Sequence, residues 1–167
     1  RVYWDAGYNG GYNRIDKAAV ESEYEGNWNH WAFTKNAVTG EMKIFLNGVL
    51  WHSGTNLTNT MTDIVQFTIG AACTWGNYYH GDIDDFQIFN VALDASTIQQ
   101  WMYQLPNETH PFYNQLQLLY TFDETGGIVI DHSPNSHDGF ISGDAQLLLH
   151  APNEIFKNFT TLDQRPQ

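Results

Sequence analysis

Hydrophobic and polar positions alternate along most of the chain, which is the pattern of half-buried β-strands. The segment at 27–36, NWNHWAFTKN, carries aromatic side chains on both faces, as expected for a strand covered on two sides. Two β-rich arms at 42–54 flank Asn47-Gly48, the favoured pair for a two-residue type I′ hairpin turn. Further strands are predicted at 63–70 and 82–91.

One helix interrupts this pattern, and it is predicted late, over 94–104. Asp94 or Ser96 could cap its first turn, because their side chains accept hydrogen bonds from orphan backbone N–H groups. An apolar i, i+3, i+4 stripe begins at Ile98 and predicts a face packed on a core. The sequence therefore predicts an all-β antiparallel sandwich of the jelly-roll type with one short late helix.

The chain also divides into parts along its length. Residues 105–115 hold two prolines and two asparagines and are predicted to be a linker. Residues 116–150 are predicted to start fresh strands separated by Asx, Ser and Gly turns, and residues 151–167 are predicted to be an exit segment. The chain begins at Arg1 and not at a methionine, as is expected of a processed product, a proteolytic fragment or an excised segment without its signal peptide.

Charge narrows the classes of partner. The chain has 7 Lys+Arg against 19 Asp+Glu, a formal charge of −12. Nucleic acids and anionic membranes are therefore not expected as partners, because both are bound by clusters of basic side chains. No apolar stretch approaches the ~18 residues of a membrane span, so no membrane insertion is expected. A lone cysteine, Cys73, excludes an intrachain disulfide.

Residues 28–103 resemble the laminin-G-like, concanavalin A-like (LamG-like) jelly roll found in large secreted bacterial proteins. The matching motifs are a Trp-led strand, a hairpin of the form K-x-F-x-N-G, an Ile-Gly strand end and the run GDIDDFQIFNVALD. The resemblance implies that residues 1–104 are the C-terminal part of one such unit, incomplete at the N-terminus.

Residues 118–145, LLYTFDETGGIVIDHSPNSHDGFISGDA, are similar to the opening strands of the same family, although they follow the helix. Residues 116–150 are thus either the opening strands of a second LamG-like unit or permuted strands of the same one. Both alternatives leave sheet edges unpaired, and exposed edges invite strand addition. We expect other segments of the parent polypeptide, or a second chain, to complete the sheet.

The acids of GDIDDF suggest two kinds of chemistry. Laminarinase-like hydrolases of this fold class use acids spaced E-x-D-x-x-E on one strand, with the carboxylates of a retaining pair ~5 Å apart. Asp82 and Asp84 share a face, but Gln87 stands at the third acid position, so no catalytic residues and no enzyme activity are expected.

Calcium is the second kind of chemistry, and it is what the resemblance implies. The family holds Ca²⁺ with an acid of this strand and with oxygens of the opening loop, and Ca²⁺ accepts carboxylates, amides and carbonyls together. Pro134 departs from the family pattern, where a glycine is usual. The implied ligands of a structural calcium ion are Asp84, Asp85, Asp131, Ser133 and Asn135. Equally, the acids could cap turns and solvate an edge strand.

Sugar binding by lectin-like jelly rolls uses loop aromatics beside polar groups, because a pyranose ring stacks on an aromatic face. The segment CTWGNYYHG offers Trp75, Tyr78 and Tyr79 between glycines, and Trp4 and Trp51 are placed in two further loops. Any one of these rings could instead serve in packing.

The resemblance implies a non-catalytic function in adhesion or carbohydrate binding, within a multi-domain secreted or cell-surface protein. The expected partner is a glycan or glycoconjugate. Two alternatives remain, namely a structural spacer without a ligand and an accessory module of a secreted carbohydrate-active enzyme.

Overall fold

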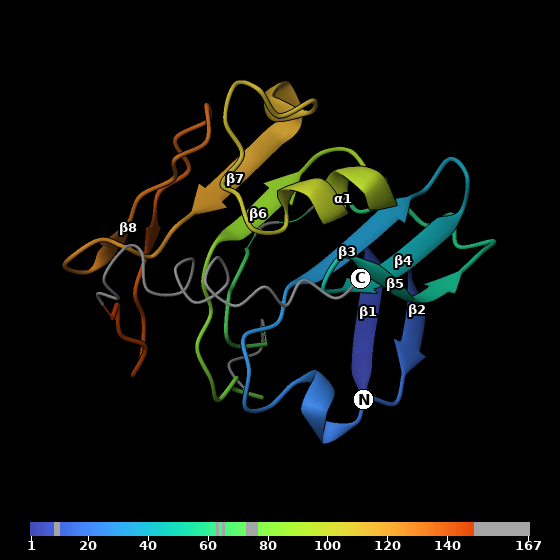
Figure 1. The fold of residues 1–167 in the computed structure, drawn as a ribbon, viewed down its shortest axis with the longest axis horizontal. Helices are drawn as coiled ribbons and strands as arrows, with labels where there is room; N and C mark the ends of the chain where they lie inside the picture. The colour runs from blue at the N-terminus through green and yellow to red at the C-terminus, as the bar shows by residue number, and fades with distance from the viewer. Residues whose placement is uncertain (9–10, 63, 65, 73–76, 149–167) are drawn as a thin grey trace. The chain divides into compact units, whose positions relative to one another are not determined.

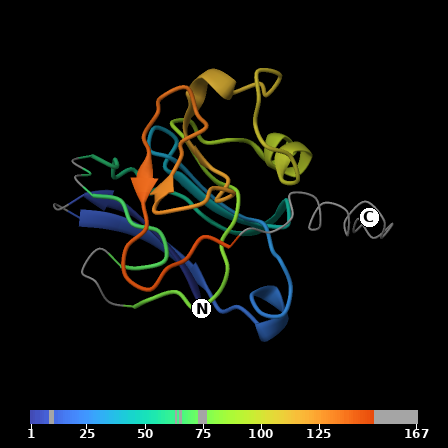
Figure 2. The same ribbon diagram turned by 90° about the vertical axis from the view of Figure 1, so that its left-hand side faces the viewer.

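The chain is an all-β protein with a short helix, as the computed structural model of residues 1–8, 11–62, 64, 66–72 and 77–148 shows (Figures 1 and 2). The bounds are β1 Val2–Tyr8, β2 Gly11–Lys17, η1 Glu21–Glu23 (a 3-10 turn), β3 Trp31–Asn36, β4 Glu41–Leu46, β5 Val49–Gly54, β6 Phe86–Phe89, α1 Ala95–Trp101, η2 Tyr113–Gln115 (a second 3-10 turn), β7 Leu116–Tyr120, β8 Ile128–Val129 and β9 Gly139–Phe140.

Within these residues the strands form four antiparallel sheets, with the orders β1–β2, β3–β4–β5, β6–β7 and β8–β9. The helices of this part of the chain fall short of the length and apolar character that crossing a membrane requires.

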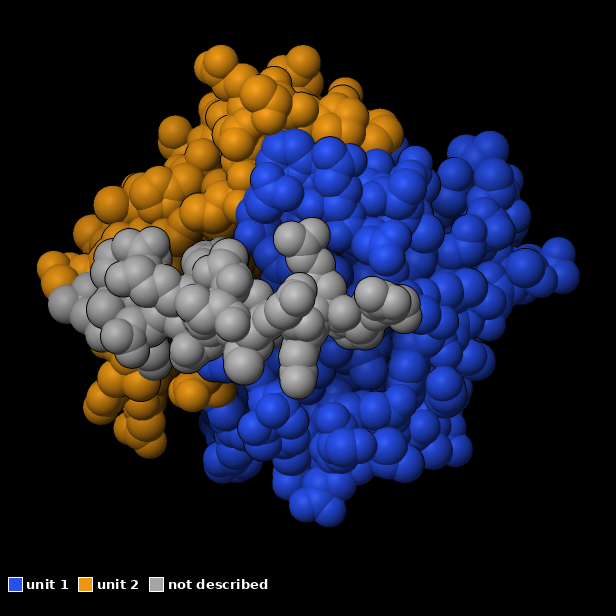
Figure 3. All heavy atoms as spheres, in the orientation of Figure 1, with its two compact units in different colours: residues 1–81, 91–104 blue, residues 82–90, 105–167 orange. Residues whose placement is uncertain are grey.

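Two compact units divide the chain (Figure 3). Unit 1 comprises residues 1–81 and 91–104, and unit 2 comprises residues 82–90 and 105–167. The predicted linker therefore opens the second stretch of unit 2, and the strand with the acids belongs to unit 2 as well. The predicted module boundaries stay predictions about the parent protein, since the compact units follow a different division.

The core of unit 1 lies between the β1–β2 hairpin and the β3–β4–β5 sheet. Ala6 and Ile15 from the hairpin pack with Met42 and Ile44 of β4, and tryptophans lie around this cluster. Met42 and Ile44 are two positions apart, so they share one face of their strand, as the period-two pattern predicted. This packing of one sheet on another confirms the sandwich class.

The Asn47-Gly48 turn is confirmed in detail. Asn47 and Gly48 have φ angles of 51° and 76°, as a type I′ turn requires, and they join β4 to β5. Gly48 is needed twice over, because a Cβ there would lie 2.8 Å from Sδ of Met102 just beyond α1. The turn thus brings the helix close to the hairpin.

The predicted helix is confirmed with a shorter range. Asp94 is its N-cap, and its Oδ1 accepts a hydrogen bond of 2.7 Å from the backbone N–H of Thr97. Ile98 is buried, as the apolar stripe predicted. The helix ends at Trp101, before the predicted Gln104.

Two strand predictions differ from the structure. The described residues between 63 and 70 form no strand, and Ile64 and Phe67 are 61% and 54% exposed, so this run lacks the burial that favours strands. The strand predicted at 82–91 begins only at Phe86, because Asp85 has a left-handed φ of 51° that breaks the extended backbone.

Unit 2 is organised by the β6–β7 ladder, which pairs Phe86 with Tyr120 and Phe89 with Leu116. The ladder therefore joins residues on opposite sides of the predicted linker. β7 is the most buried strand of this unit, with Leu116, Leu118, Leu119 and Tyr120 all buried.

Candidate functional site

The loop after β8 is fastened to β7 by one carboxylate. The side chain of Asp131 is buried, and its Oδ1 accepts hydrogen bonds of 2.9 Å from the backbone N–H groups of Leu119 and Ser133. Its Oδ2 accepts one of 2.8 Å from the backbone N–H of His137 and one of 2.8 Å from the hydroxyl of Ser133. Four donors therefore converge on one carboxylate.

Asn135 of this loop also bonds to β7. Its Nδ2 donates to the carbonyl of Leu116 over 2.8 Å and lies 3.3 Å from the carbonyl of Gln117. The Asn135 amide thus helps to hold the loop on the strand.

Hydrogen bonding sets the ionisation of Asp131. Burial on its own would raise the pKa of this carboxyl group, but bonds from the backbone of His137, Leu119 and Ser133 outweigh burial and lower the pKa below its usual range. A carboxylate has about four lone-pair sites, and here four donors fill them. A cation at Asp131 would have to displace some of these donors.

The start of β6 presents the opposite situation. Burial, together with the negative charges of Asp84 and Asp123, raises the pKa of Asp85 to about 7. Asp84 accepts a hydrogen bond of 3.0 Å from the backbone N–H of Asp85. Asp85 is therefore a half-buried carboxyl group whose charged form lacks compensation, and a cation beside it would supply that compensation.

The implied calcium ligands therefore fall into two groups, of which the acids at the start of β6 suit a cation better than the residues of the loop after β8. Among the described residues, no group of three or more His, Cys, Asp or Glu side chains is arranged to hold a metal ion. The loop residues Asp131, Ser133 and Asn135 are engaged in the bonds above, whereas Asp84 and Asp85 have the charge that a cation would stabilise. Asp123 also acts on Asp85, and no spacing in the sequence indicates this because only the fold places the two acids near each other.

Two of the predicted sugar-binding tryptophans are packed in unit 1. Trp4 lies within β1 and not in a loop, and its Nε1 donates to the carbonyl of Thr34 over 3.1 Å. Trp51 lies within β5, with its ring 5.3 Å from that of Trp31 and its Nε1 2.7 Å from Oε1 of Glu23. The prediction that these two tryptophans lie in loops was wrong, because both rings pack against the core of unit 1 from within a strand.

The tyrosines of the segment CTWGNYYHG are presented differently. Tyr78 and Tyr79 are 61% and 56% exposed, while Trp75 lies outside the described residues. A Cβ on Gly81 would lie 2.8 Å from the hydroxyl of Tyr79, so the glycine lets this ring lie close to the backbone. Two neighbouring aromatic side chains are thus accessible in this segment.

The alternation of side chains along β1 and β2 produces another exposed group, which was not among the residues predicted from the sequence. Tyr3, Tyr12 and Arg14 project from one face of this hairpin, with Arg14 paired to Asp5. The period-two pattern could have found them, but only once the register between the two strands was known.

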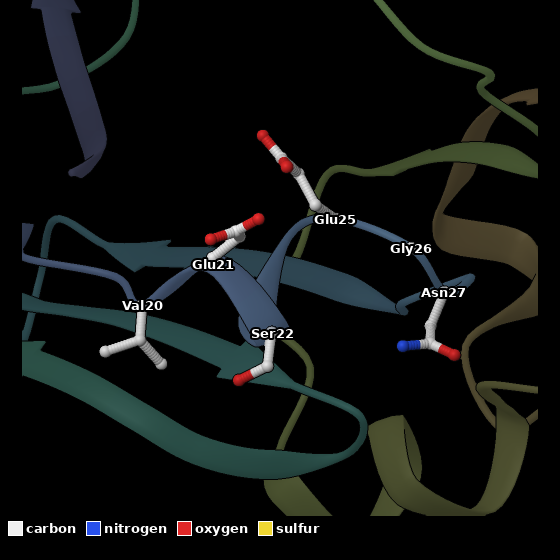
Figure 4. Close-up of a pocket in the computed structure, with 6 residues that line it drawn as sticks. All are labelled: Val20, Glu21, Ser22, Glu25, Gly26 and Asn27. Carbon is white, nitrogen blue, oxygen red and sulfur yellow. The ribbon is translucent and has the colours of Figure 1, made fainter.

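A shallow hollow lies beside η1 in unit 1 (Figure 4). The side chains of Glu21 and Glu25 extend to one side of this segment, and those of Ser22 and Asn27 extend to the other. None of the predicted site residues lines it. Its lining is Val20, Glu21, Ser22, Glu25, Gly26 and Asn27.

Two solved structures resemble this chain. A Bacteroides ovatus protein, provisionally described as a carbohydrate-binding protein, matches with a TM-score of 0.59 and 20% sequence identity, over 86% of this chain and 43% of its own. An S-layer domain-containing protein from Clostridium thermocellum matches with a TM-score of 0.39 and 24% identity, over 60% of this chain and 50% of its own. The chain therefore spans half or less of either protein.

No curated protein matches the sequence. The sequence model of the concanavalin A-like lectin/glucanases superfamily, in contrast, matches residues 1–99, more than half of the chain. The match includes the β1–β2 hairpin, the Asn47-Gly48 turn and the start of α1, and it agrees with the sheet-on-sheet packing of unit 1. The chain belongs to the concanavalin A-like lectin/glucanases superfamily.

Proposed function

We propose that this chain is a non-catalytic carbohydrate-binding module of a multi-domain protein. The observation that supports it most directly is the pair of exposed aromatic side chains at Tyr78 and Tyr79 on a concanavalin A-like scaffold. Sugars bind to such surfaces because an aromatic ring covers the apolar face of a pyranose while polar neighbours bond to its hydroxyls. The provisional description of the Bacteroides ovatus protein points to the same class of ligand.

The residues near β6 depart from the hydrolase pattern at one of its three acid positions. A glycosidase needs two carboxyl groups flanking the scissile bond, and Gln87 stands where the third acid of the hydrolase pattern would be. The raised pKa of Asp85 would suit a general acid, so a direct assay is informative. We expect no release of reducing sugar from any polysaccharide that the chain binds.

A glycan array tests the binding proposal. We expect the chain to bind one group of glycans and Tyr78→Ala or Tyr79→Ala to weaken that binding about tenfold. Tyr24→Ala is the matched control, because Tyr24 is 50% exposed but lies beside η1. Equal binding by all three variants would contradict a site at these tyrosines, and no binding by the parent chain would favour a spacer without a ligand.

Calcium belongs to the proposal as a structural ion, and its best-supported position is beside Asp84 and Asp85. The supporting observation is the uncompensated charge at Asp85, which a divalent cation would stabilise. Unfolding measured with calcium and with a chelator tests it, and a chain indifferent to calcium would contradict it.

The cellular setting is proposed on the same basis. We place the parent protein outside the cell, secreted or at the cell surface, with adhesion to glycans as the role of this module. In unit 1, β1, β2, β3 and β5 have one neighbour each in the described sheets, so further strands of the parent polypeptide or of a second chain could extend them. A chain that is monomeric and resistant to proteases on its own would contradict such completion.

A further inference from the structure

A second exposed aromatic surface lies on the β1–β2 hairpin, on the face opposite the core of unit 1. Ala6 and Ile15 point into that core, so the neighbouring positions on both strands point away from it. Tyr3 and Tyr12 are 52% and 58% exposed on this outer side. We call this surface the tyrosine face and define it by Tyr3, Asp5, Tyr12 and Arg14.

Arg14 is held at the centre of the tyrosine face. Its Nε and Nη2 atoms each donate a hydrogen bond of 2.6 Å to the two carboxylate oxygens of Asp5, its partner in the ladder. Its Cζ lies 4.9 Å from the ring centroid of Tyr3 and 5.3 Å from that of Tyr12. The two rings and the guanidinium therefore form one continuous strip, and the two-pronged bond to Asp5 fixes its middle.

A glycine keeps one end of this strip open. Gly7 is the ladder partner of Tyr12, and a Cβ there would overlap backbone atoms of Gly11 and Tyr12. Because Gly7 has no side chain, nothing from β1 stands directly opposite the ring of Tyr12. The ring can then be reached from the side of the neighbouring strand.

The charges on this face cancel. Arg14 pairs with Asp5, and Arg1 pairs with Asp16 on the same face. Local neutrality is notable in a chain with a formal charge of −12. A ligand with many negative charges finds no surplus of positive charge here, so the face suits an uncharged ligand rich in hydroxyl groups.

We propose that the tyrosine face is a second glycan-binding site, which takes an uncharged polysaccharide chain. Tyr3 and Tyr12 stack on pyranose rings, while Arg14, which has five N–H donors and uses two for Asp5, donates to sugar hydroxyls. Because the strip runs across both rings, it matches several linked sugars rather than one. The inference rests on the proposed carbohydrate-binding function and names a ligand class and a site for it.

Native affinity electrophoresis of the whole chain tests this assignment. The gels contain soluble β-glucan, xylan or mannan as uncharged probes, polygalacturonate as an acidic probe, or no polysaccharide. We expect at least one uncharged probe to retard the chain, and Tyr3→Ala and Tyr12→Ala to weaken that retardation about tenfold in apparent affinity. Tyr24→Ala, the matched exposed control in unit 1, should be retarded like the parent chain.

Arg14→Lys guards against a variant that fails to fold. Lysine keeps the positive charge but cannot form the two-pronged bond to Asp5, so the strip loses its fixed centre. We expect weaker retardation of Arg14→Lys with an unfolding midpoint close to that of the parent chain. Tyr12→Phe, which keeps the ring, should retain most of the binding.

Each outcome separates this inference from the proposed function. Loss of retardation with Tyr78→Ala but not with the tyrosine-face variants would overturn the second site and leave a carbohydrate-binding module. Retardation by polygalacturonate alone would overturn the uncharged ligand. A parent chain retarded by no polysaccharide would overturn the module and this site together.

Discussion

Asp131 and Asp85 are two carboxyl groups of the same unit in opposite electrostatic situations. Asp131 is buried among four donors, and its pKa is lowered; Asp85 is half-buried beside two other acids, and its pKa is raised to about 7. Burial alone would raise both pKa values, so the surroundings decide the sign. The comparison indicates that Asp131 holds the loop after β8 in place through its hydrogen bonds. The negative charge of Asp85, in contrast, is not compensated by its surroundings.

The largest expected effect comes from Asp131→Asn. The amide retains the shape but removes the charge and turns an NH2 group toward donors, which leaves buried N–H groups unsatisfied. We expect a loss of more than about 3 kcal/mol in the free energy of unfolding, because bonds to charged groups contribute about 1.5–3 kcal/mol each. Denaturant unfolding measures the loss, and hydrogen exchange should show faster exchange of the Leu119 and His137 amides.

Asp144→Asn is the matched control for that variant, because Asp144 is an exposed acid in the same unit. Its free energy of unfolding should change by less than about 0.5 kcal/mol. If Asp131→Asn were equally mild, the hydrogen bonds to Asp131 would contribute little, and the comparison with Asp85 would fail.

The second effect in size is calcium binding. A ligand that binds only the folded state, at ~100 times its Kd, stabilises that state by about 2.7 kcal/mol. We expect the thermal unfolding midpoint to rise by several degrees in calcium relative to chelator, and Asp85→Asn to lose most of this rise. Asp144→Asn should keep it. If the unfolding midpoint of the parent chain did not change with calcium, the alternative would hold, in which Asp84 and Asp85 cap turns and solvate an edge strand.

The smallest effect is expected for Asp85→Asn without calcium, because Asp85 is only half-buried and solvent screens its charge. The folded-state pKa of Asp85 is raised to about 7 from its ordinary value of 3.8, so the folded chain binds more protons than the unfolded chain between these two pH values. Its stability therefore falls as pH rises from about 4 to about 7, and the variant should lack this fall. Asparagine also tolerates the left-handed φ of 51° at this position.

Unfolding midpoints of both chains, measured in chelator across this pH range, check the prediction. The variant should be more stable than the parent chain by a few degrees at about pH 8, and the difference should vanish below about pH 4. A variant less stable than the parent at about pH 8 would mean that the Asp85 charge has a compensating partner.

The turn and the helix cap could be predicted from the sequence because each depends on the chemistry of a few neighbouring residues. Asn47-Gly48 set a type I′ turn because both positions need positive φ, and Asp94 capped the helix because its side chain reaches the third amide. The strand expected at 63–70 failed, since an apolar run forms a strand only where the fold buries it. The superfamily was predictable because many weak motifs occurred in order.

The candidate sites were less predictable because they depend on pairing at long range. The acids Asp84 and Asp85 were found from the sequence, but Asp123 lies far along the chain and becomes their neighbour only through the β6–β7 ladder. The tyrosine face could not be predicted for the same reason, since the register of the hairpin is what brings Arg14 close to Tyr3. The sequence shows which residues of one strand share a face, but it does not show which residues of two strands lie opposite each other.

The way the chain passes between its units limits how the protein can be divided. It leaves unit 1 at residue 81, supplies β6 to unit 2, returns to unit 1 for α1, and enters unit 2 again at residue 105. A cut after residue 104 would look safe in the sequence but would separate β6 from β7. Each unit is built from two separate stretches of the chain. A truncated chain, a fusion protein or a recombinant between relatives therefore contains a complete unit only if it includes both stretches of that unit.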